Sequence, residues 1–171
     1  NIYTKHIKLH NPGDICYLFY EEEERIPDAY ARVFKSDISY GKKCKEESLK
    51  AFIPEDDFDW GDDKNPKIPY KDALCYCLHV RGFTAHASSG VKYKGTFAGL
   101  MEKIPYLKET GITTVELQPV YEFIEYKDTQ KTISYGVKQE EKLNYWGYTR
   151  GYYYAPKASY SATADSVKEF K

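Results

Sequence analysis

The sequence lacks an excess of charge of either sign. Lysine and arginine together number 25, aspartate and glutamate 26, and the formal net charge at pH 7 is −1. A protein that gathers nucleic-acid phosphates or anionic lipid headgroups usually does so with a surplus of positive charge. We therefore predict that neither nucleic acid nor a membrane surface is a partner of this chain.

Long hydrophobic runs are missing as well, and cysteine is scarce. No run approaches the 18 apolar residues of a membrane-spanning helix, and the first residues form no apolar segment. Of the four cysteines (Cys16, Cys44, Cys75 and Cys77), the last two stand two apart on an expected strand, where a mutual disulfide is geometrically unfavourable. No second Cys or His pair has zinc-ligand spacing. We expect buried, reduced thiols in a soluble, cytoplasmic protein.

Acidic residues are dense between positions 56 and 63, but they lack the order of a looped calcium site. The stretch "DDFDWGDD" does not follow the Asp-x-Asp-x-Asp-Gly pattern, and it has no closing glutamate at the required place. We predict no metal site and no cofactor.

What the sequence does have in quantity is tyrosine, with 18 residues against two tryptophans and 16% aromatic residues in all. A tyrosine ring offers an apolar face and a polar rim, which suits a core edge and equally suits stacking on a sugar ring or a partner. Composition alone does not distinguish tyrosines that pack in a core from tyrosines that stack on a ligand. The densest aromatic stretch is "LNYWGYTRGYYYAPKASYSA", residues 143–162, which has neither helical nor strand period.

The middle of the chain has the pattern of an α/β domain. Residues 73–83 are a continuous apolar run typical of a buried strand, and residues 112–120 are a second one, rich in β-branched side chains. Between them an apolar stripe predicts a helix that Pro105 divides into two short segments and Gly111 caps. The stripe consists of Phe97, Leu100, Met101, Ile104 and Leu107. A strand, a helix and a strand with short connections predict a right-handed parallel unit.

The flanking regions complete the predicted organisation. Residues 1–34 have the pattern of the last strands of a β domain, residues 35–71 that of a polar connector, and residues 72–171 that of the α/β domain. From residue 121 to about residue 162 the sequence has neither helical nor strand periodicity. Such a stretch is too long for a loop that only connects two elements. In parallel α/β folds, the loops that follow the carboxyl ends of the strands bind the ligands. A helix is expected to begin near Asp165.

Four segments together resemble the isoamylase, pullulanase and glycogen-debranching branch of the α-amylase superfamily of glycoside hydrolases. They are "IPDAYARVF", "DDFDWGDDKNPKIPYKDALCYCLHVRGFT", "GTFAGLMEKIPYLKETGITTVELQPVYEF" and "NYWGYTRGYYYAPKASYSA". The resemblance covers nearly all of the chain from Pro27 onward. It implies a (β/α)8 TIM barrel preceded by a carbohydrate-binding-type β-sandwich, and hydrolysis of α-1,6 branch points in α-glucans with retention of configuration. It also implies that the chain is a fragment that ends before the third barrel strand.

Retaining hydrolysis needs a carboxylate nucleophile and a carboxylic acid about 5 Å apart. In the family these groups, and a third aspartate, lie at the ends of the fourth, fifth and seventh strands, so the resemblance assigns no catalytic residue here. Glu116 falls within a strand, and Glu122 is expected to order a loop as a hydrogen-bond acceptor. We expect the chain by itself to be inactive.

What the resemblance does carry over is a platform for sugar. Tyr148 matches the family tyrosine that stacks under a glucose ring, and Gly147 allows the backbone to turn. Tyr145 and Trp146 are expected to hold the platform, and Asn144 to hydrogen-bond the loop.

Other residues of the same region have less specific expectations. Gln118 is a further candidate to reach the substrate. His79 is expected to be a satisfied core histidine, with a place in the active-site floor as the alternative. Arg81 is compatible equally with the active-site floor and with a role as a buried, hydrogen-bonded organiser of the loops. Packing is expected of the remaining tyrosines of the stretch, which are Tyr152, Tyr153, Tyr154 and Tyr160. Phe123 stands at a position where some isoamylases have an oxygen ligand for calcium. Its side chain offers no oxygen, which argues against calcium here.

Two other functions remain open at this point. The chain is also compatible with a non-catalytic α-glucan-binding module that keeps the aromatic platform, and with a related transglycosidase such as a branching enzyme, for which "NYWGY" is less typical. The unpaired edge of the strand at residues 112–120 predicts that the isolated chain self-associates.

Overall fold

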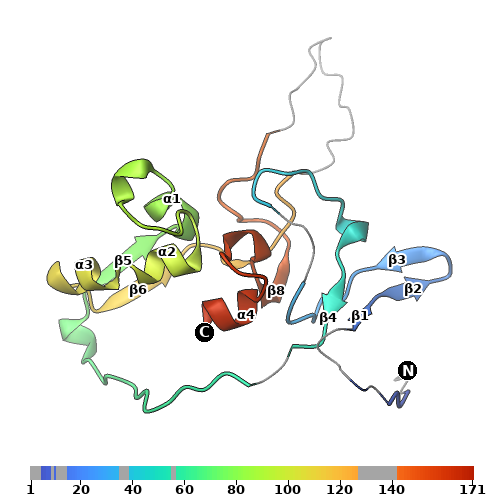
Figure 1. Ribbon diagram of the computed structural model, residues 1–171, viewed down its shortest axis with the longest axis horizontal. Helices are drawn as coiled ribbons and strands as arrows, with labels where there is room; N and C mark the ends of the chain where they lie inside the picture. Colours follow the sequence, from blue (N-terminus) through green and yellow to red (C-terminus); the bar gives the residue numbers. More distant parts are fainter. Residues whose placement is uncertain (1–4, 9, 11–14, 35–38, 55–56, 127–141) are drawn as a thin grey trace, which may run out of the picture.

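The computed structural model describes residues 5–8, 10, 15–34, 39–54, 57–126 and 142–171. In Figure 1 the unit that contains β5 and β6 lies at one end, the short strands β1 to β4 lie at the other, and β8 and α4 lie between them. The described strands form four separate two-stranded sheets. The chain is thus an α/β structure in which small sheets are joined by long irregular segments.

The amino-terminal strands are short and antiparallel. β2 (Phe19–Glu21) and β3 (Glu24–Ile26) form a hairpin, and β1 (Cys16–Tyr17) pairs with β4 (Ala51–Phe52). β4 follows the 3-10 helix η2 (Glu46–Ser48), so the segment expected to be a connector also contributes a strand. One hydrophobic core joins these strands to β8, and it consists of Ala31, Phe34, Leu49, Ala51, Tyr152 and Ala155.

The predicted parallel unit is confirmed. β5 (Cys75–Leu78) pairs in parallel with β6 (Thr114–Leu117), and the helix between them is divided into α2 (Phe97–Met101) and α3 (Ile104–Glu109), with Pro105 in the first turn of α3. Gly111 adopts the expected left-handed conformation, with φ +82°. Additional short elements of this part are η3 (Tyr70–Asp72), α1 (Val80–Thr84) and η4 (Ala87–Ser89).

Three expectations for this unit are wrong. The first strand ends at Leu78 and not near Phe83, because His79 caps helix α1, which takes up the rest of the apolar run. Most residues of β5 and β6 are exposed, since each strand has one partner and no layer covers both faces of this sheet within the described residues. For the same reason Cys75 and Cys77 are exposed rather than buried. Cys16 is also exposed, and Cys44 is half-buried.

The apolar stripe of the divided helix is only partly buried. Phe97 and Leu107 are buried, whereas Met101 and Ile104 are exposed. Pro105 separates the two segments, so the stripe does not continue on one face from α2 into α3. Val80, Phe97 and Tyr160 form the second buried cluster, and Leu100 and Leu117 pack against it.

The segment expected to lack regular structure contains a second antiparallel pair. β7 (Tyr121–Glu122) pairs with β8 (Tyr152–Pro156), with an irregular register between Tyr121 and Glu122. The 3-10 helix η5 (Ala158–Tyr160) follows β8, and α4 (Ser166–Phe170) begins after Asp165, whose side chain accepts from Lys168 N as expected of an N-cap. Among the helices of the described ranges, none is long and apolar enough to cross a membrane.

Candidate functional site

The turn at residues 144–148 is fixed by hydrogen bonds to its own backbone. Asn144 Oδ1 accepts from Gly147 N at 3.1 Å, and Tyr121 Oη donates to Gly147 O at 2.9 Å and to Thr149 O at 3.0 Å. Asn144 N donates to Glu125 O at 2.7 Å, which ties the start of the turn to the segment after β7. The turn is therefore held from both sides by groups outside it.

Gly147 is required in this turn for two reasons. Its φ is +76°, a conformation that strains other L residues. A Cβ at this position would also lie 2.5 Å from Phe123 Cε1 and 3.0 Å from Pro119 Cβ. The backbone thus passes close over Phe123, and any side chain at position 147 would push the turn away from that ring.

This turn leaves two aromatic rings open to solvent. Tyr148 is 71% exposed and Trp146 is 55% exposed, on either side of the buried Gly147. Tyr145 is half-buried and meets Trp146 edge to face, with ring centroids 5.1 Å apart. Because hydrogen bonds already hold the backbone of the turn, a ligand that stacks on these rings does not have to order that backbone. Tyr148 and Trp146 therefore present accessible rings on a fixed backbone, and Tyr145 packs against the Trp146 ring.

His79 fastens the turn to the end of β5. Gly82 N donates to His79 Nδ1 at 3.0 Å, so the neutral ring carries its proton on Nε2, and Nε2 lies 2.9 Å from Tyr145 O and 3.1 Å from Tyr160 Oη. Burial lowers the pKa of His79, and the nearby Arg81 charge lowers it further, while the bond to the Tyr145 carbonyl opposes the shift. His79 is the satisfied, buried histidine that the sequence predicts.

Arg81 and Gln118 take different positions near this turn. The Arg81 guanidinium lies over the Tyr40 ring, 3.6 Å from its centroid, and packs against Gly95, which agrees with the loop-organising alternative of the two that the sequence leaves open. Gln118 N donates to Leu78 O, and Gln118 Oε1 is a buried atom without a hydrogen-bond partner among the described residues. Gln118 therefore has a free acceptor next to the parallel strands.

The other tyrosines of the aromatic stretch divide into two groups. Tyr152 and Tyr160 are buried, which confirms the packing prediction for these two. Tyr153 and Tyr154 pack on one aromatic neighbour each, Tyr121 and Tyr30 respectively, but both side chains are more than half exposed. The physical reason is the irregular register of the β7–β8 pair, because two consecutive residues of β8 then face solvent instead of alternating.

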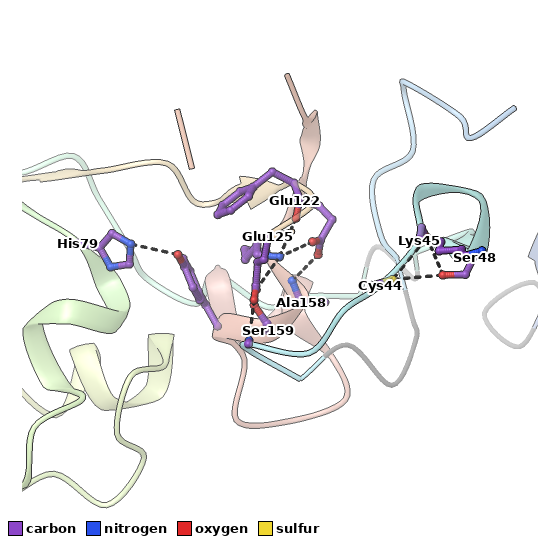
Figure 2. Close-up of polar contacts among 12 residues, drawn as sticks. Cys44, Lys45, Ser48, His79, Glu122, Glu125, Ala158 and Ser159 are labelled. Atoms are coloured by element: carbon purple, nitrogen blue, oxygen red, sulfur yellow. Dashed lines mark hydrogen bonds and ion pairs between the residues drawn. The ribbon is translucent and has the colours of Figure 1, made fainter. Parts of the chain in front are cut away.

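Behind the turn lies a buried cluster of charges that composition and spacing did not indicate. Lys157 Nζ lies 2.7 Å from Glu122 Oε1, 2.9 Å from Phe123 O and 3.1 Å from Glu125 Oε1. Glu122 Oε2 accepts from Ala158 N, which confirms its expected role as a loop-ordering acceptor. Figure 2 shows Glu122 and Glu125 side by side, with Ala158 and Ser159 next to them. We call these three charged residues and the Phe123 carbonyl the Lys157 cluster.

No family model matches the sequence. Individual proteins do match. The chain is 32% identical over 165 residues to isoamylase 1 of Arabidopsis thaliana, covering 90% of this chain and 21% of the relative. It is 30% identical over 169 residues to a glycogen operon protein GlgX homolog of Mycobacterium tuberculosis, covering 84% of this chain and 22% of the relative.

Solved structures of pullulanases are also similar to this chain. The pullulanase SAP of Group B Streptococcus is similar with a TM-score of 0.61 and 27% identity, over 91% of this chain and 22% of that one. A pullulanase of Paenibacillus barengoltzii, in complex with maltohexaose and α-cyclodextrin, has a TM-score of 0.59 and 27% identity, over 83% of this chain and 23% of that one.

The similar proteins define a superfamily of enzymes and one branch within it. The chain is an α/β relative of the glycoside hydrolases of the α-amylase superfamily. Within that superfamily the proteins that it is similar to are isoamylases, GlgX proteins and pullulanases, which are the debranching branch that its sequence resembles. The chain spans about a fifth of the length of the relatives it matches.

Proposed function

We propose that these residues are part of an α-glucan debranching glycoside hydrolase that cleaves α-1,6 branch points in glycogen, starch or pullulan with retention. The observation that carries the proposal is the exposed Tyr148 ring on a turn that Asn144, Tyr121 and Gly147 hold in place. In this proposal Tyr148 stacks under the sugar at the cleavage site. Trp146, Tyr145 and Asn144 support it. Gln118 stays a candidate for substrate contact, for which its buried Oε1 atom would have to become accessible.

The relatives support an α-glucan as the substrate. One similar pullulanase was solved with maltohexaose and α-cyclodextrin, and a mutant of the same protein with maltotriose. Isoamylases and GlgX proteins are the curated relatives. The exposed aromatic rings of this chain are the side chains that such sugars stack on.

We further propose the architecture that the resemblance implies. Residues 1–34 would end a β-sandwich, residues 35–71 would connect, and residues 72–171 would open a (β/α)8 barrel, of which β5 and β6 are the first two strands. The catalytic carboxylates would then come from later strands, so the described residues supply substrate binding rather than bond cleavage. A cytoplasmic location stays a prediction.

The test uses the natural full-length polypeptide that includes these residues, incubated with pullulan and with amylopectin. Release of linear chains by α-1,6 cleavage is the expected result. We expect Tyr148→Ala to lower kcat/KM at least about tenfold, which corresponds to about 1.4 kcal/mol of lost transition-state binding. Tyr70→Ala is the matched control, since Tyr70 is 97% exposed and lies in η3, outside the site.

Three results would contradict the proposal. Equal kcat/KM values for Tyr148→Ala and Tyr70→Ala would remove the platform role. Retention by an amylopectin gel without any hydrolysis would favour the non-catalytic binding module, and transfer of chains to new branch points would favour a branching enzyme.

A further inference from the structure

A second set of exposed aromatic rings lines a cleft between β8, α4 and the segment around Trp60. The cleft has a volume of about 540 Å³, within the roughly 300–1,000 Å³ of sites that bind small ligands. Trp60, Tyr153 and Tyr154 line it, and these side chains are 56%, 64% and 61% exposed. We call this feature the Trp60 cleft.

The Trp60 side of the cleft is a hydrogen-bonded turn. Asp59 Oδ1 accepts from Gly61 N at 2.7 Å, and Trp60 O accepts from Asp63 N at 3.1 Å. The Trp60 ring meets the Phe58 ring edge to face, with centroids 4.8 Å apart. Like the turn that carries Tyr148, this turn presents an exposed ring on a backbone that is already ordered.

The β8 side of the cleft carries two tyrosine rings, each placed by another ring. Tyr154 stacks on Tyr30, with centroids 5.6 Å apart and an angle of 25° between the planes. Tyr153 meets Tyr121 edge to face at 4.7 Å. The rings that line the cleft are therefore positioned before any ligand arrives.

The two sides are joined through α4. Asp57, which begins the segment of the Trp60 turn, pairs with Lys168 of α4 at 2.7 Å. The Lys171 ammonium lies 5.7 Å from the centroid of the Phe58 ring. Phe170 of the same helix also lines the cleft. The walls thus come from distant parts of the chain that contact one another.

The chemistry of the walls fits a neutral sugar chain. A glucose unit has flat apolar faces, on which aromatic rings stack, and a rim of hydroxyl groups. Arg32 lines the cleft, and a guanidinium donates hydrogen bonds to hydroxyl oxygens, while the phenol hydroxyls of the tyrosines donate and accept.

Tyr121 makes the cleft continuous with the turn described above. Its ring lines the cleft, and its hydroxyl donates to Gly147 O and Thr149 O beside Tyr148. One residue therefore borders both places where exposed rings gather. A glucan chain that reaches one of them is close to the other.

We propose that the Trp60 cleft is a second α-glucan site, in which Trp60 and Tyr154 stack on glucose units and Arg32 donates to their hydroxyl groups. This inference rests on the proposed function for the identity of the ligand. A polymer held in the cleft and at Tyr148 together binds more tightly than one held at Tyr148 alone. The cleft thus favours long glucans over short ones.

The test compares the natural full-length polypeptide with its Trp60→Ala and Tyr154→Ala variants. We expect KM for amylopectin to rise at least about fivefold with kcat within about twofold, because the cleft contributes binding away from the reacting bond. For a short branched malto-oligosaccharide, kcat/KM should stay within about twofold. Tyr70→Ala is the matched control, since Tyr70 is exposed in η3 and does not line the cleft.

Retention in an amylopectin gel gives a readout that needs no hydrolysis. Weaker retention of Trp60→Ala than of Tyr70→Ala would support the cleft even if the polypeptide cleaved no glucan and the proposed function failed. Equal retention of these variants would overturn the inference. An equal rise in KM for the short substrate would overturn it too, because the effect would then not depend on a second point of contact.

A further measurement needs no substitution and decides the case if the variants do not fold. Hydroxyl-radical oxidation of the full-length polypeptide, read by mass spectrometry, should modify Trp60 and Tyr154 at least about threefold more slowly with maltohexaose present. The rate at Tyr70 should not change. Equal oxidation of Trp60 with and without the sugar would overturn the inference. So would a Trp60 that is protected without sugar, since another part of the polypeptide would then fill the cleft.

Discussion

The imidazole of His79 lies flat against the phenol ring of Tyr145, with ring centroids 4.4 Å apart and an angle of 11° between the planes. The same imidazole faces the Tyr145 carbonyl through Nε2 and caps helix α1 through Nδ1. The contact with Gly82 N requires the neutral form, since a proton on Nδ1 would remove the acceptor, whereas Nε2 donates to the Tyr145 carbonyl in either form. The turn that carries Tyr148 is therefore sensitive to the protonation of one residue.

This relationship predicts how stability depends on pH. The pKa of His79 is lower in the folded protein than its usual value near 6.5, mainly because of burial, so the unfolded chain binds the proton more readily. The stability that neutral His79 contributes is fully present above the pKa that His79 has in the unfolded chain. It is lost as the pH falls through 6.5 toward the pKa that His79 has in the folded protein. We expect His79→Gln, which keeps a donor and an acceptor, to narrow the drop in melting temperature between pH 7.5 and pH 5.5. An unchanged drop would show that other groups cause it.

The close approach at Gly147 predicts a large effect of a single methyl group. Gly147→Ala should lower the free energy of unfolding by about 2–4 kcal/mol, from strain at positive φ and from contact with Phe123. Gly90→Ala is the matched control, because Gly90 has φ +69° and no atom lies within 4 Å of the place that an added methyl group would take. It should cost about 1 kcal/mol. Equal costs in urea denaturation would mean that Phe123 does not restrict the turn.

The hydroxyl of Tyr152 predicts a smaller effect in the core that joins β8 to the amino-terminal strands. Tyr152 Oη donates to Glu46 Oε1 at 2.7 Å, and burial, followed by this contact, raises its pKa. Tyr152→Phe should cost about 1–2 kcal/mol, because it removes the bond and keeps the ring. Tyr152→Ala should cost about 3–5 kcal/mol, since it also removes the packing on Phe34. Similar losses of unfolding free energy for Tyr152→Phe and Tyr152→Ala would contradict separate contributions from the hydroxyl and the ring.

The exposed sheet β5–β6 predicts the behaviour of the 171 residues expressed by themselves. Leu74, Tyr76 and Val115 are exposed on or next to these strands. We expect self-association at micromolar concentration, measured by sedimentation velocity, and we expect Val115→Lys to shift the chain toward monomer. A monodisperse monomer before substitution would remove this prediction.

Local sequence signals predicted the local elements well. Pro105 divided the helix, Gly111 ended it, and Asp165 began the last one, because each acts within one turn of its own position. Two parallel strands around that helix followed from periodicity alone. The motif "NYWGY" correctly indicated a turn at Gly147 with a hydrogen bond from Gly147 N to the Asn144 side chain.

Long-range partners could not be predicted in the same way. Lys157 meets Glu122 across 35 positions, and nothing in a single sequence pairs one lysine with one glutamate. The apolar run after Leu78 continues into a helix because His79 caps it, and apolar runs do not distinguish a strand from a buried helix. The short pair β7–β8 was missed because its tyrosines do not alternate with polar residues.

Glu125 also has a consequence for the order in which this chain folds. Its side chain accepts from Gly41, 84 positions earlier, and from Ser159, 34 positions later, while its main chain accepts from Asn144. Contacts between residues so far apart form slowly, because the intervening chain must first be ordered. During synthesis the Ser159 contact can form only after residue 159 has left the ribosome, so the hydrogen bonds of Glu125 are completed only after both parallel strands have been synthesised.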